Sequence, residues 1–273
     1  MPSPSADTPY LSFLRVPDMG RKPRRHGILI ASDFYPGHRT VEDILETRSG
    51  IIDFAKLPDH VGNIAFYRER WFRERIELYH RYDIRTFPGG VTFEVAEVQG
   101  KSERFFEALK KVGFDGVEVS TDVIAKPTPK RRTELIGLAK EMGFIVFTEV
   151  GLKDPVGLME VEPTVQEIRE NLEAGSFKVT IENSEIVQLV REAPDRLERI
   201  VEEVGLRHLS FEVWPVGFPD LAARLFRLFG PGVNIENVDL VQVIAADQMR
   251  RGMNRATNYG FLADPKAWPD LEP

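Results

Sequence analysis

The stretch GVEVSTDVIAKPTPKRRTELIGLAKEMGFIVFTEVG, residues 116–151, contains two short runs of apolar and β-branched residues separated by a longer helical pattern. The first run is GVEVST (116–121) and the second is FIVFTEVG (144–151). Such runs are typical of strands that are buried on both faces of a parallel sheet. Thr128 followed by Pro129 supplies an N-cap and a first-turn proline for the helix between them. The stretch therefore predicts a strand, a helix and a second strand.

The same alternation continues on both sides of this unit. Six more runs have the composition of strands, and helical patterns separate them: HGILIASD (26–33), GIIDFAKL (50–57), IRTFPGG (84–90), FKVTIE (177–182), LSFEVW (209–214) and NIENVDL (234–240). Eight strands that alternate with helices indicate a closed barrel rather than an open doubly wound sheet. We predict an α/β fold, a single TIM (β/α)8 barrel over residues 26–273, preceded by a loose N-terminal arm over residues 1–25.

Composition excludes several classes of protein. The 273 residues include no cysteine, which removes disulfides, thiolate nucleophiles and cysteine-ligated metals. No stretch approaches the roughly 18 apolar residues that span a membrane. The net charge of −7 argues against nucleic acid as a partner, and we interpret the basic cluster in residues 21–25 as a solvated arm or a subunit contact. We expect a cytoplasmic homo-oligomer that binds a small anionic substrate.

Glutamates stand at the carboxyl ends of four successive predicted strands: Glu118, Glu149, Glu182 and Glu212. In a TIM barrel the loops after the strands form the active-site face, so these side chains should converge. Unpaired converging carboxylates are costly to bury, and a hard cation with oxygen ligands removes that cost. We predict the four glutamates as metal ligands and Mg²⁺ as the cofactor. The alternative is that each glutamate pairs with a nearby arginine or lysine across the mouth of the barrel.

One aspartate and two lysines complete the candidate catalytic set. Asp33 and Lys56 end the first and second predicted strands, and Lys153 follows the fifth. Either lysine could bind an anion beside the carboxylates, although a single lysine at a strand end is more often a salt-bridge partner. His38 and His60 follow the first two strands, where an acid or base role remains open.

Small and polar residues near the strand ends are candidate substrate ligands. Gly89 and Gly90 would let the backbone approach an anion and donate N–H groups to it, although a tight turn would use the same glycines. Ser120 lies two residues after Glu118 and therefore faces the same side of its strand. Asn234, near the last predicted strand, is a further candidate substrate ligand.

With these residues the chain resembles the phosphosulfolactate synthase family. The similarity is clearest in IELYHRYDIRTFPGGVTFEVA (76–96), ALKKVGFDGVEVS (108–120) and AKEMGFIVFTEVG (139–151). The resemblance implies a Mg²⁺-dependent TIM-barrel lyase that adds sulfite to phosphoenolpyruvate. It also implies that Mg²⁺ holds the substrate carboxylate and stabilises an enolate-like intermediate, while Lys56 or Lys153 supplies a proton or holds an anion.

The chain departs from the family pattern at positions that should bind anions. Phe34 stands where the family has lysine, LPDHVG (57–62) replaces a glycine-rich run, and ENSEIV (182–187) replaces a loop with arginine and glycine. Asn254 and Arg255 replace an Arg-Gly pair, and Arg255 is one remaining cation for the substrate. We therefore predict that sulfite is not the preferred nucleophile. Two alternatives stay open: a homologue in specialised metabolism that catalyses another addition or elimination, such as hydration, and a non-catalytic stress or interaction protein on the same barrel.

Overall fold

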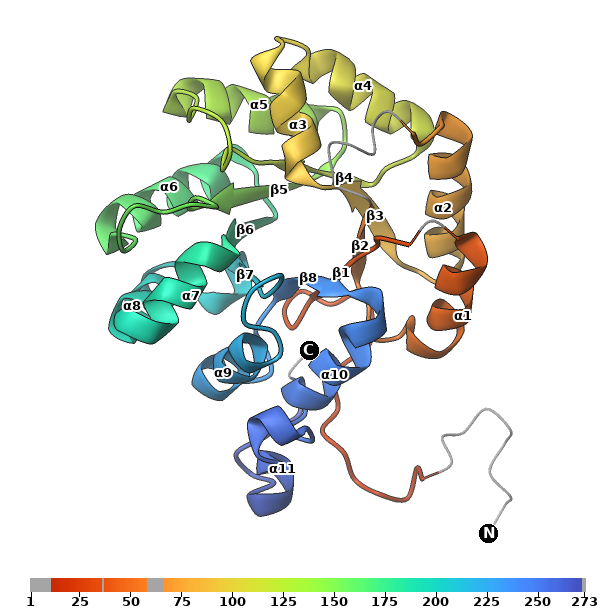
Figure 1. Cartoon of the computed structure of the whole chain (residues 1–273), viewed down its shortest axis with the longest axis vertical. Coiled ribbons are helices and arrows are strands. Elements are labelled where there is room, and N and C mark those ends of the chain that lie inside the picture. Colours follow the sequence, from red (N-terminus) through yellow and green to blue (C-terminus); the bar gives the residue numbers. More distant parts are fainter. Residues whose placement is uncertain (1–10, 36, 58–65, 272–273) are drawn as a thin grey trace.

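The structure is a computed structural model that describes residues 11–35, 37–57 and 66–271. Eight parallel strands form one sheet in the order β3-β2-β1-β8-β7-β6-β5-β4, and helices surround it (Figure 1). The strands are β1 (Leu29–Ser32), β2 (Phe54–Leu57), β3 (Arg85–Pro88), β4 (Gly116–Val119), β5 (Ile145–Val150), β6 (Lys178–Ile181), β7 (Leu209–Glu212) and β8 (Ile235–Asp239). Each predicted run contains one of these strands, so the predicted barrel is confirmed.

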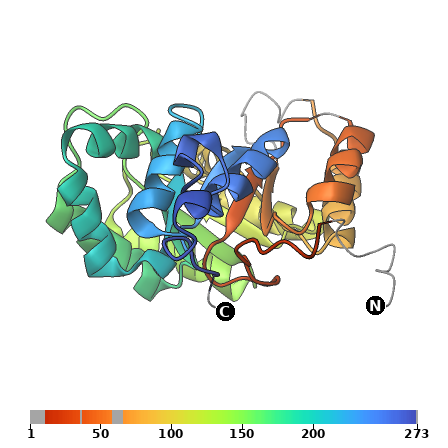
Figure 2. The same cartoon turned by 90° about the horizontal axis from the view of Figure 1, so that it is seen from below.

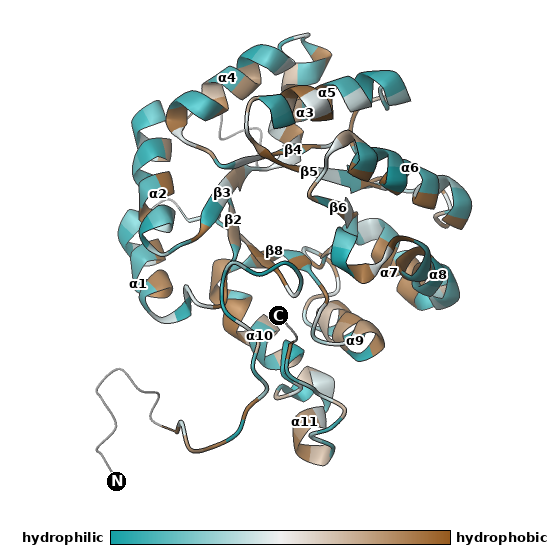
Figure 3. Ribbon diagram, turned by 180° about the vertical axis from the view of Figure 1, so that it is seen from behind, coloured by the Kyte–Doolittle hydropathy of each residue, from teal (hydrophilic) through white to brown (hydrophobic). Residues whose placement is uncertain are grey.

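The helices lie outside the sheet and alternate with the strands. They are α1 (His38–Arg48), α2 (Glu69–Arg81), α3 (Gly90–Val98), α4 (Ser102–Val112), α5 (Pro129–Glu141), α6 (Val161–Ala174), α7 (Asn183–Glu192), α8 (Pro194–Val204), α9 (Asp220–Phe229), α10 (Val243–Arg250) and α11 (Gly260–Ala263). Hydrophilic residues predominate on α2, whereas α9 is largely hydrophobic (Figure 3). None of the described helices is long and apolar enough to cross a membrane.

The sheet closes between β3 and β4, the two strands at the ends of its order. The Asp115 N–H donates to the Thr86 carbonyl at 3.0 Å, and the Thr86 N–H donates to Asp115 Oδ2 at 2.7 Å. These bonds replace a β-ladder at this position. We call the junction between β3 and β4 the seam of the barrel.

Aromatic side chains fill the interior near the amino-terminal ends of the strands. Phe54, Phe87 and Phe147 form a cluster with Ile28 and Ile30, and the rings of Phe87 and Phe147 stack with their centroids 4.4 Å apart. Since side chains alternate along a strand, the next inward positions after Phe54 and Phe147 are two residues further on. The aromatic layer therefore lies directly below the residues of the mouth.

The end of the predicted arm contacts the amino-terminal end of the barrel. Lys22 Nζ donates to the carbonyls of Ile52 and Tyr82 at 3.1 Å each, and Arg24 pairs with Asp53 at 2.8 Å. The sequence analysis interpreted the basic cluster in residues 21–25 as a solvated arm or a subunit contact. In the structure, Lys22 and Arg24 of this cluster bind carbonyls and a carboxylate of the barrel instead. The first described residues, from residue 11 onward, extend away from the barrel in Figure 1. The segment after residue 17 runs beside the C-terminal residues in Figure 2, where the Leu271 N–H donates to the carbonyl of Asp18 at 2.7 Å.

Candidate active site

A cavity of about 410 Å³ lies at the carboxyl ends of the strands. All eight strands, or the loops after them, contribute to its lining. The lining residues are Phe34, Lys56, Gly90, Val91, Glu118, Glu149, Lys153, Glu182, Asn183, Ser184, Glu212, Trp214, Pro215, Val216 and Asn237. The cavity therefore brings together the four predicted glutamates, both predicted lysines and one of the two predicted glycines.

Lys56 lies at the floor of the cavity between two carboxylates. Its Nζ is 3.1 Å from Glu118 and 2.9 Å from Glu236, and the side chain is buried. Burial acts to lower the pKa of Lys56, but Glu118 and Glu236 outweigh it and raise the pKa well above its usual value. Burial raises the pKa of Glu118 to about 7, although Lys56 opposes the shift. Lys56 is therefore a fixed cation that suits binding of an anion more than release of a proton.

Lys153 occupies the rim, with 40% of its side chain exposed. Its Nζ lies 2.6 Å from Asp122 Oδ2 and 3.1 Å from Glu182 Oε2. Burial acts to lower the pKa of Lys153, but Glu149 and the other carboxylates raise it above its usual value. This ammonium can leave its partners for solvent, which the enclosed Lys56 cannot do.

Glu149 stands at the centre of the acidic side chains. Possible ligand oxygens of Glu118, Glu149 and Glu236 lie within 4.8 Å of one another, and so do those of Asp122, Glu149 and Glu182. Glu149 is 7% exposed, and among the described residues its carboxylate makes no hydrogen bond or ion pair. Burial, and then the charges of Glu118 and Asp122, raise the pKa of Glu149 well above its usual value. The alternative of one basic partner for each glutamate therefore does not describe Glu149.

Glu212 is held by amides instead of by a lysine. It accepts the Asn183 N–H at 3.3 Å and a short hydrogen bond from the Asn237 side chain. Burial, and then the neighbouring Glu182, raise the pKa of Glu212 well above its usual value. Glu212 belongs to neither of the two triads, whereas the other three predicted metal ligands do.

Gly90 permits a close approach between α3 and β4. A Cβ atom at this position would lie 2.4 Å from the Cβ of Ser120, and the Gly90 N–H donates to Glu118 Oε2 at 2.7 Å. The preceding Gly89 uses its carbonyl to accept the Thr92 hydroxyl at 2.7 Å and is not among the described lining residues. The Gly90 amide is thus occupied by a carboxylate of the protein itself.

Ser120 lies behind Gly90 and joins two carboxyl groups that the sequence prediction missed. Its hydroxyl bonds to Glu94 and, at 2.6 Å, to Asp122 Oδ1. Glu94 also accepts the Val123 N–H at 3.0 Å, so α3 positions the loop that carries Asp122. Burial, and then the hydrogen bond with Asp122, raise the pKa of Glu94 to about 7. Burial also acts to raise the pKa of Asp122, but Glu94 and Lys153 outweigh it and lower that pKa.

Asp33 points away from the cavity. It accepts the Tyr79 hydroxyl at 2.9 Å and pairs with Arg75, both on α2. The cause is strand alternation, because Ile28 and Ile30 face the interior and Asp33 has the opposite parity. Arg75 also donates to His38 Nδ1 at 3.0 Å, so His38 lies with this outer group.

Asn234 and Arg255 lie outside the mouth. Asn234 precedes β8 at the amino-terminal end, where its Oδ1 accepts the Ile28 N–H at 2.9 Å and its Nδ2 donates to the Leu209 carbonyl at 2.6 Å. Arg255 is exposed in a short 3₁₀ turn. Asn237 is the residue of β8 that lines the cavity, and its φ of 57° marks an irregularity in the strand. His60 lies outside the described residues.

Glu236 is the third acidic residue that the sequence prediction missed. It is fully buried on β8, where it binds Lys56 and accepts the Thr180 hydroxyl at 2.6 Å. A signal for it was present, because Glu236 lies two residues after Asn234 and so faces the same side of the strand. For Glu94 the signal was its place in the PGGVTFE motif (88–94), in which the sequence analysis gave a role to the two glycines but not to the glutamate.

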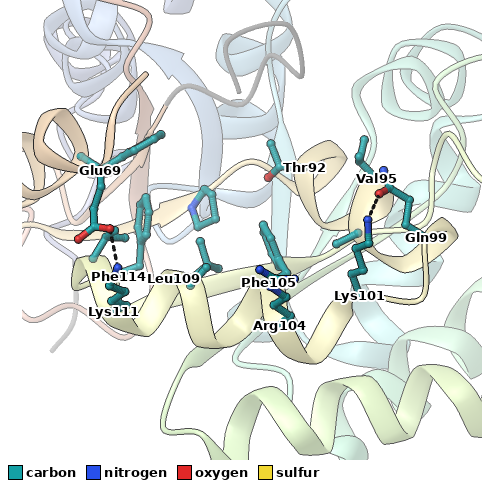
Figure 4. Close-up of a pocket in the computed structure, with 15 residues that line it drawn as sticks. Glu69, Thr92, Val95, Gln99, Lys101, Arg104, Phe105, Leu109, Lys111 and Phe114 are labelled. Atoms are coloured by element: carbon teal, nitrogen blue, oxygen red, sulfur yellow. Dashed lines mark hydrogen bonds and ion pairs between the residues drawn. The ribbon is translucent and has the colours of Figure 1, made fainter. Parts of the chain in front are cut away.

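A larger cavity of about 580 Å³ lies outside the sheet between α2, α3 and α4 (Figure 4). Its walls are mainly apolar and include Phe105, Leu109 and Phe114. At its edge Lys111 pairs with Glu69 at 2.8 Å. Among the residues that the structure covers, no group of metal-ligating side chains lies in this cavity. The mouth of the barrel is therefore the candidate active site.

A parallel barrel that gathers carboxylates and lysines at the carboxyl ends of its strands defines a barrel enzyme with an acidic active site able to bind a metal ion. The family model described as (2R)-phospho-3-sulfolactate synthase (ComA) matches residues 17–255. The chain belongs to this family, which makes it a lyase-type enzyme and confirms the resemblance found in the sequence.

Individual relatives agree with this assignment. The chain is similar to the phosphosulfolactate synthase of Methanothermobacter thermautotrophicus, with 29% identity over 253 residues that cover 90% of this chain and 96% of the relative. It is also similar to that of Methanocaldococcus jannaschii, with 29% identity and coverage of 86% and 95%. Among solved structures, N-acetylneuraminate lyase from Mycoplasma synoviae has a TM-score of 0.54 at 9% identity, covering 90% of this chain and 78% of the other. That likeness concerns the fold alone.

Proposed function

We propose that this enzyme is a Mg²⁺-dependent lyase or synthase that adds a small nucleophile to phosphoenolpyruvate or a related enol acid. The observation that carries the proposal is Glu149, a buried carboxylate that two triads of acidic oxygens share and that has no partner among the described residues. All donors in these triads are carboxylate oxygens, which Mg²⁺ prefers. The donor set therefore fits the ion.

We assign the ion to Asp122, Glu149 and Glu182, because Lys153, their present counter-ion, is exposed enough to leave. The chemistry that Mg²⁺ supplies at such a site is electrostatic stabilisation of enolate-like charge. Lys56 stays with Glu118 and Glu236 and offers its ammonium group to an anionic part of the substrate. Lys153, once released, is a second cation at the rim.

The addition requires a proton at a defined place. The nucleophile bonds to the terminal carbon of the enol double bond, the electron pair moves toward the carboxylate, and the carbon beside the carboxylate then takes a proton. The pKa values of Lys56 and Lys153 lie above the usual lysine value, which disfavours proton release from either ammonium group. Glu118 lines the cavity and has a pKa raised to about 7 by burial, so its carboxyl group suits proton transfer near neutral pH. We therefore propose that Glu118 supplies this proton from its protonated form, in which Lys56 keeps Glu236 as its counter-ion.

The test combines Mg²⁺ calorimetry with turnover of phosphoenolpyruvate. We expect Glu149→Gln and Glu182→Gln to weaken Mg²⁺ binding by at least about tenfold, since loss of even an outer partner costs about 10–100-fold. Glu192→Gln, at an exposed position on α7, is the control and should leave the affinity unchanged. Unchanged Mg²⁺ affinity in both site variants would reject the site.

The nucleophile is tested in the same assay. Sulfite, water and other small nucleophiles are compared with phosphoenolpyruvate and Mg²⁺. We expect sulfite not to be preferred, because Phe34 replaces a family lysine beside the cavity. A sulfite-dependent kcat/KM above about 10⁴ M⁻¹s⁻¹ would contradict that expectation. Mg²⁺-dependent hydration would favour the alternative of a different addition in the same site.

A further inference from the structure

The cavity at the mouth has two chemically different parts. Glutamates at the ends of β4 to β7 line it: Glu118, Glu149, Glu182 and Glu212. Two aromatic residues also line it, Phe34 after β1 and Trp214 after β7, with ring centroids 5.4 Å apart and planes inclined by 37°. One cavity therefore combines acidic side chains with an aromatic pair.

The aromatic pair is extended by further apolar residues that also line the cavity. Pro215 and Val216 follow Trp214 in the chain. Val216 is 55% exposed, and the rings of Phe34 and Trp214 are half-buried. Ligand cavities combine such apolar surface with a few polar groups that fix the orientation of the ligand. We call Phe34, Trp214, Pro215 and Val216 the apolar wall.

The charges in the cavity restrict where a ligand can carry anionic groups. Within the described lining, the cations are Lys56 and Lys153. Once a divalent ion has released Lys153, the ion and the two ammonium groups can hold the anionic groups of the substrate. None of the described residues of the apolar wall carries a positive charge, so an anionic substituent there would have no counter-ion among them.

We propose that the substrate is a small enol, 2-oxo or 2-hydroxy acid with an apolar, preferably aromatic, substituent that lies against the apolar wall. This inference rests on the proposed function, because the acid group is assigned to the carboxylate side through Mg²⁺. Burial of the substituent against Phe34 and Trp214 removes apolar surface from water, and the rings offer offset or edge contacts to a second ring.

The test measures binding of two probe ligands to the full-length protein with Mg²⁺ by calorimetry. The probes are lactate and 3-phenyllactate, which share the 2-hydroxy acid and differ in the substituent. We expect phenyllactate to bind at least about tenfold more tightly, because the ring buries apolar area on the wall. This comparison uses the unmodified protein and so does not depend on whether a variant folds.

Two variants locate the ring preference. Trp214→Ala should reduce the affinity ratio of the two probes to below about threefold while lactate binding is retained. Tyr259→Ala, which removes an exposed aromatic ring near the start of α11, is the matched control and should keep the full ratio. Phe34→Ala is a second site variant with the same expected loss.

The outcomes separate this inference from the function on which it rests. Equal affinity of the two probes in protein that binds Mg²⁺ would overturn the inference and leave the proposed function intact. A ring preference that persists in both Trp214→Ala and Phe34→Ala would overturn it as well. Protein that binds no Mg²⁺ would overturn the proposed function, and the inference would fail with it.

Discussion

The two ends of the barrel both bury charged side chains, but they satisfy them differently. At the amino-terminal end Lys178 Nζ donates to the carbonyls of Arg25, at 2.8 Å, and Arg207. Arg250 donates there to the carbonyls of Gly27, of Ile28 at 3.3 Å and of Val233 at 3.2 Å. At the carboxyl end, carboxylates face one another and outnumber the two lysines of the described cavity lining.

This difference distinguishes charged groups that are buried to hold the fold together from charged groups that are buried to bind a ligand. Backbone carbonyls are permanent acceptors, so a cation bound to them is satisfied as soon as the chain folds. Converging side-chain carboxylates leave negative charge uncompensated until a ligand arrives. The same strand carries both arrangements, since Lys178 begins β6 and donates to backbone carbonyls, while Glu182, directly after β6, belongs to the mouth. We therefore expect changes at the amino-terminal end to lower the stability of the fold, and changes at the mouth to alter ligand binding and the pH dependence of stability.

The largest effect should come from Arg250→Met at the amino-terminal end. Loss of the guanidinium group leaves three buried carbonyls without this donor, and we expect the free energy of unfolding to fall by about 3–5 kcal/mol. Urea unfolding measures the loss. Mg²⁺ affinity of the folded variant should stay within about threefold of the parent value. A parallel fall in Mg²⁺ affinity would show that the two ends are not independent.

A smaller effect should appear in the free energy of unfolding of the metal-free protein, measured as a function of pH. The pKa of Glu118 is raised from 4.5 to about 7, mainly by burial, and the pKa of Glu149 is also raised. The folded state thus binds protons more tightly than the unfolded state, and this stabilisation is lost as pH rises through about 7. We expect a loss on the order of 1–3 kcal/mol between about pH 5 and pH 8.

Glu149→Gln provides the comparison for this measurement, because the amide does not titrate. Its stability should fall less steeply over the same pH range, and Mg²⁺ at high pH should stabilise the parent protein more than the variant. The difference between the two pH profiles isolates the mouth from other titrating groups. Identical slopes in the parent and the variant would mean that Glu149 is not a source of the pH dependence.

The smallest effect is expected from Arg255→Ala, away from both ends. The side chain is exposed, so the free energy of unfolding should change by no more than about 0.5 kcal/mol. Phosphoenolpyruvate binding should also stay within about twofold. Loss of phosphoenolpyruvate affinity by more than about tenfold would return Arg255 to the substrate ligands that the sequence suggested.

Much of the fold and part of the site could be predicted from the sequence. Buried strands are short runs of apolar and β-branched residues, and this composition can be read locally. The run FIVFTEVG therefore identified β5 directly. The parallel arrangement then brought Glu118, Glu149 and Glu182 to one end, as expected from their positions in the strands. Alternation then relates further residues to these: Glu236 shares the face of Asn234, whereas Asp33 lies opposite to Ile28 and Ile30 once the structure shows that these two face inward.

Other features depended on contacts that no local pattern contains. Glu94 reaches the mouth from α3 and meets Ser120, 26 positions later in the chain. Lys56 pairs with Glu118 across β3, so this contact requires the strand order and the closure of the sheet. The interaction of Lys22 with barrel carbonyls depends on how the arm folds back. Sequence patterns describe elements well, whereas these partners are set by tertiary packing.

The seam between β3 and β4 has a consequence for where the barrel can deform most easily. It lacks a β-ladder, and near the mouth the Gly90 amide and Lys56 bind Glu118 across it. The barrel can therefore widen here without the loss of a full row of strand hydrogen bonds. Because Glu118 lines the cavity, conformational plasticity would be concentrated beside the substrate, while the rest of the barrel stays rigid.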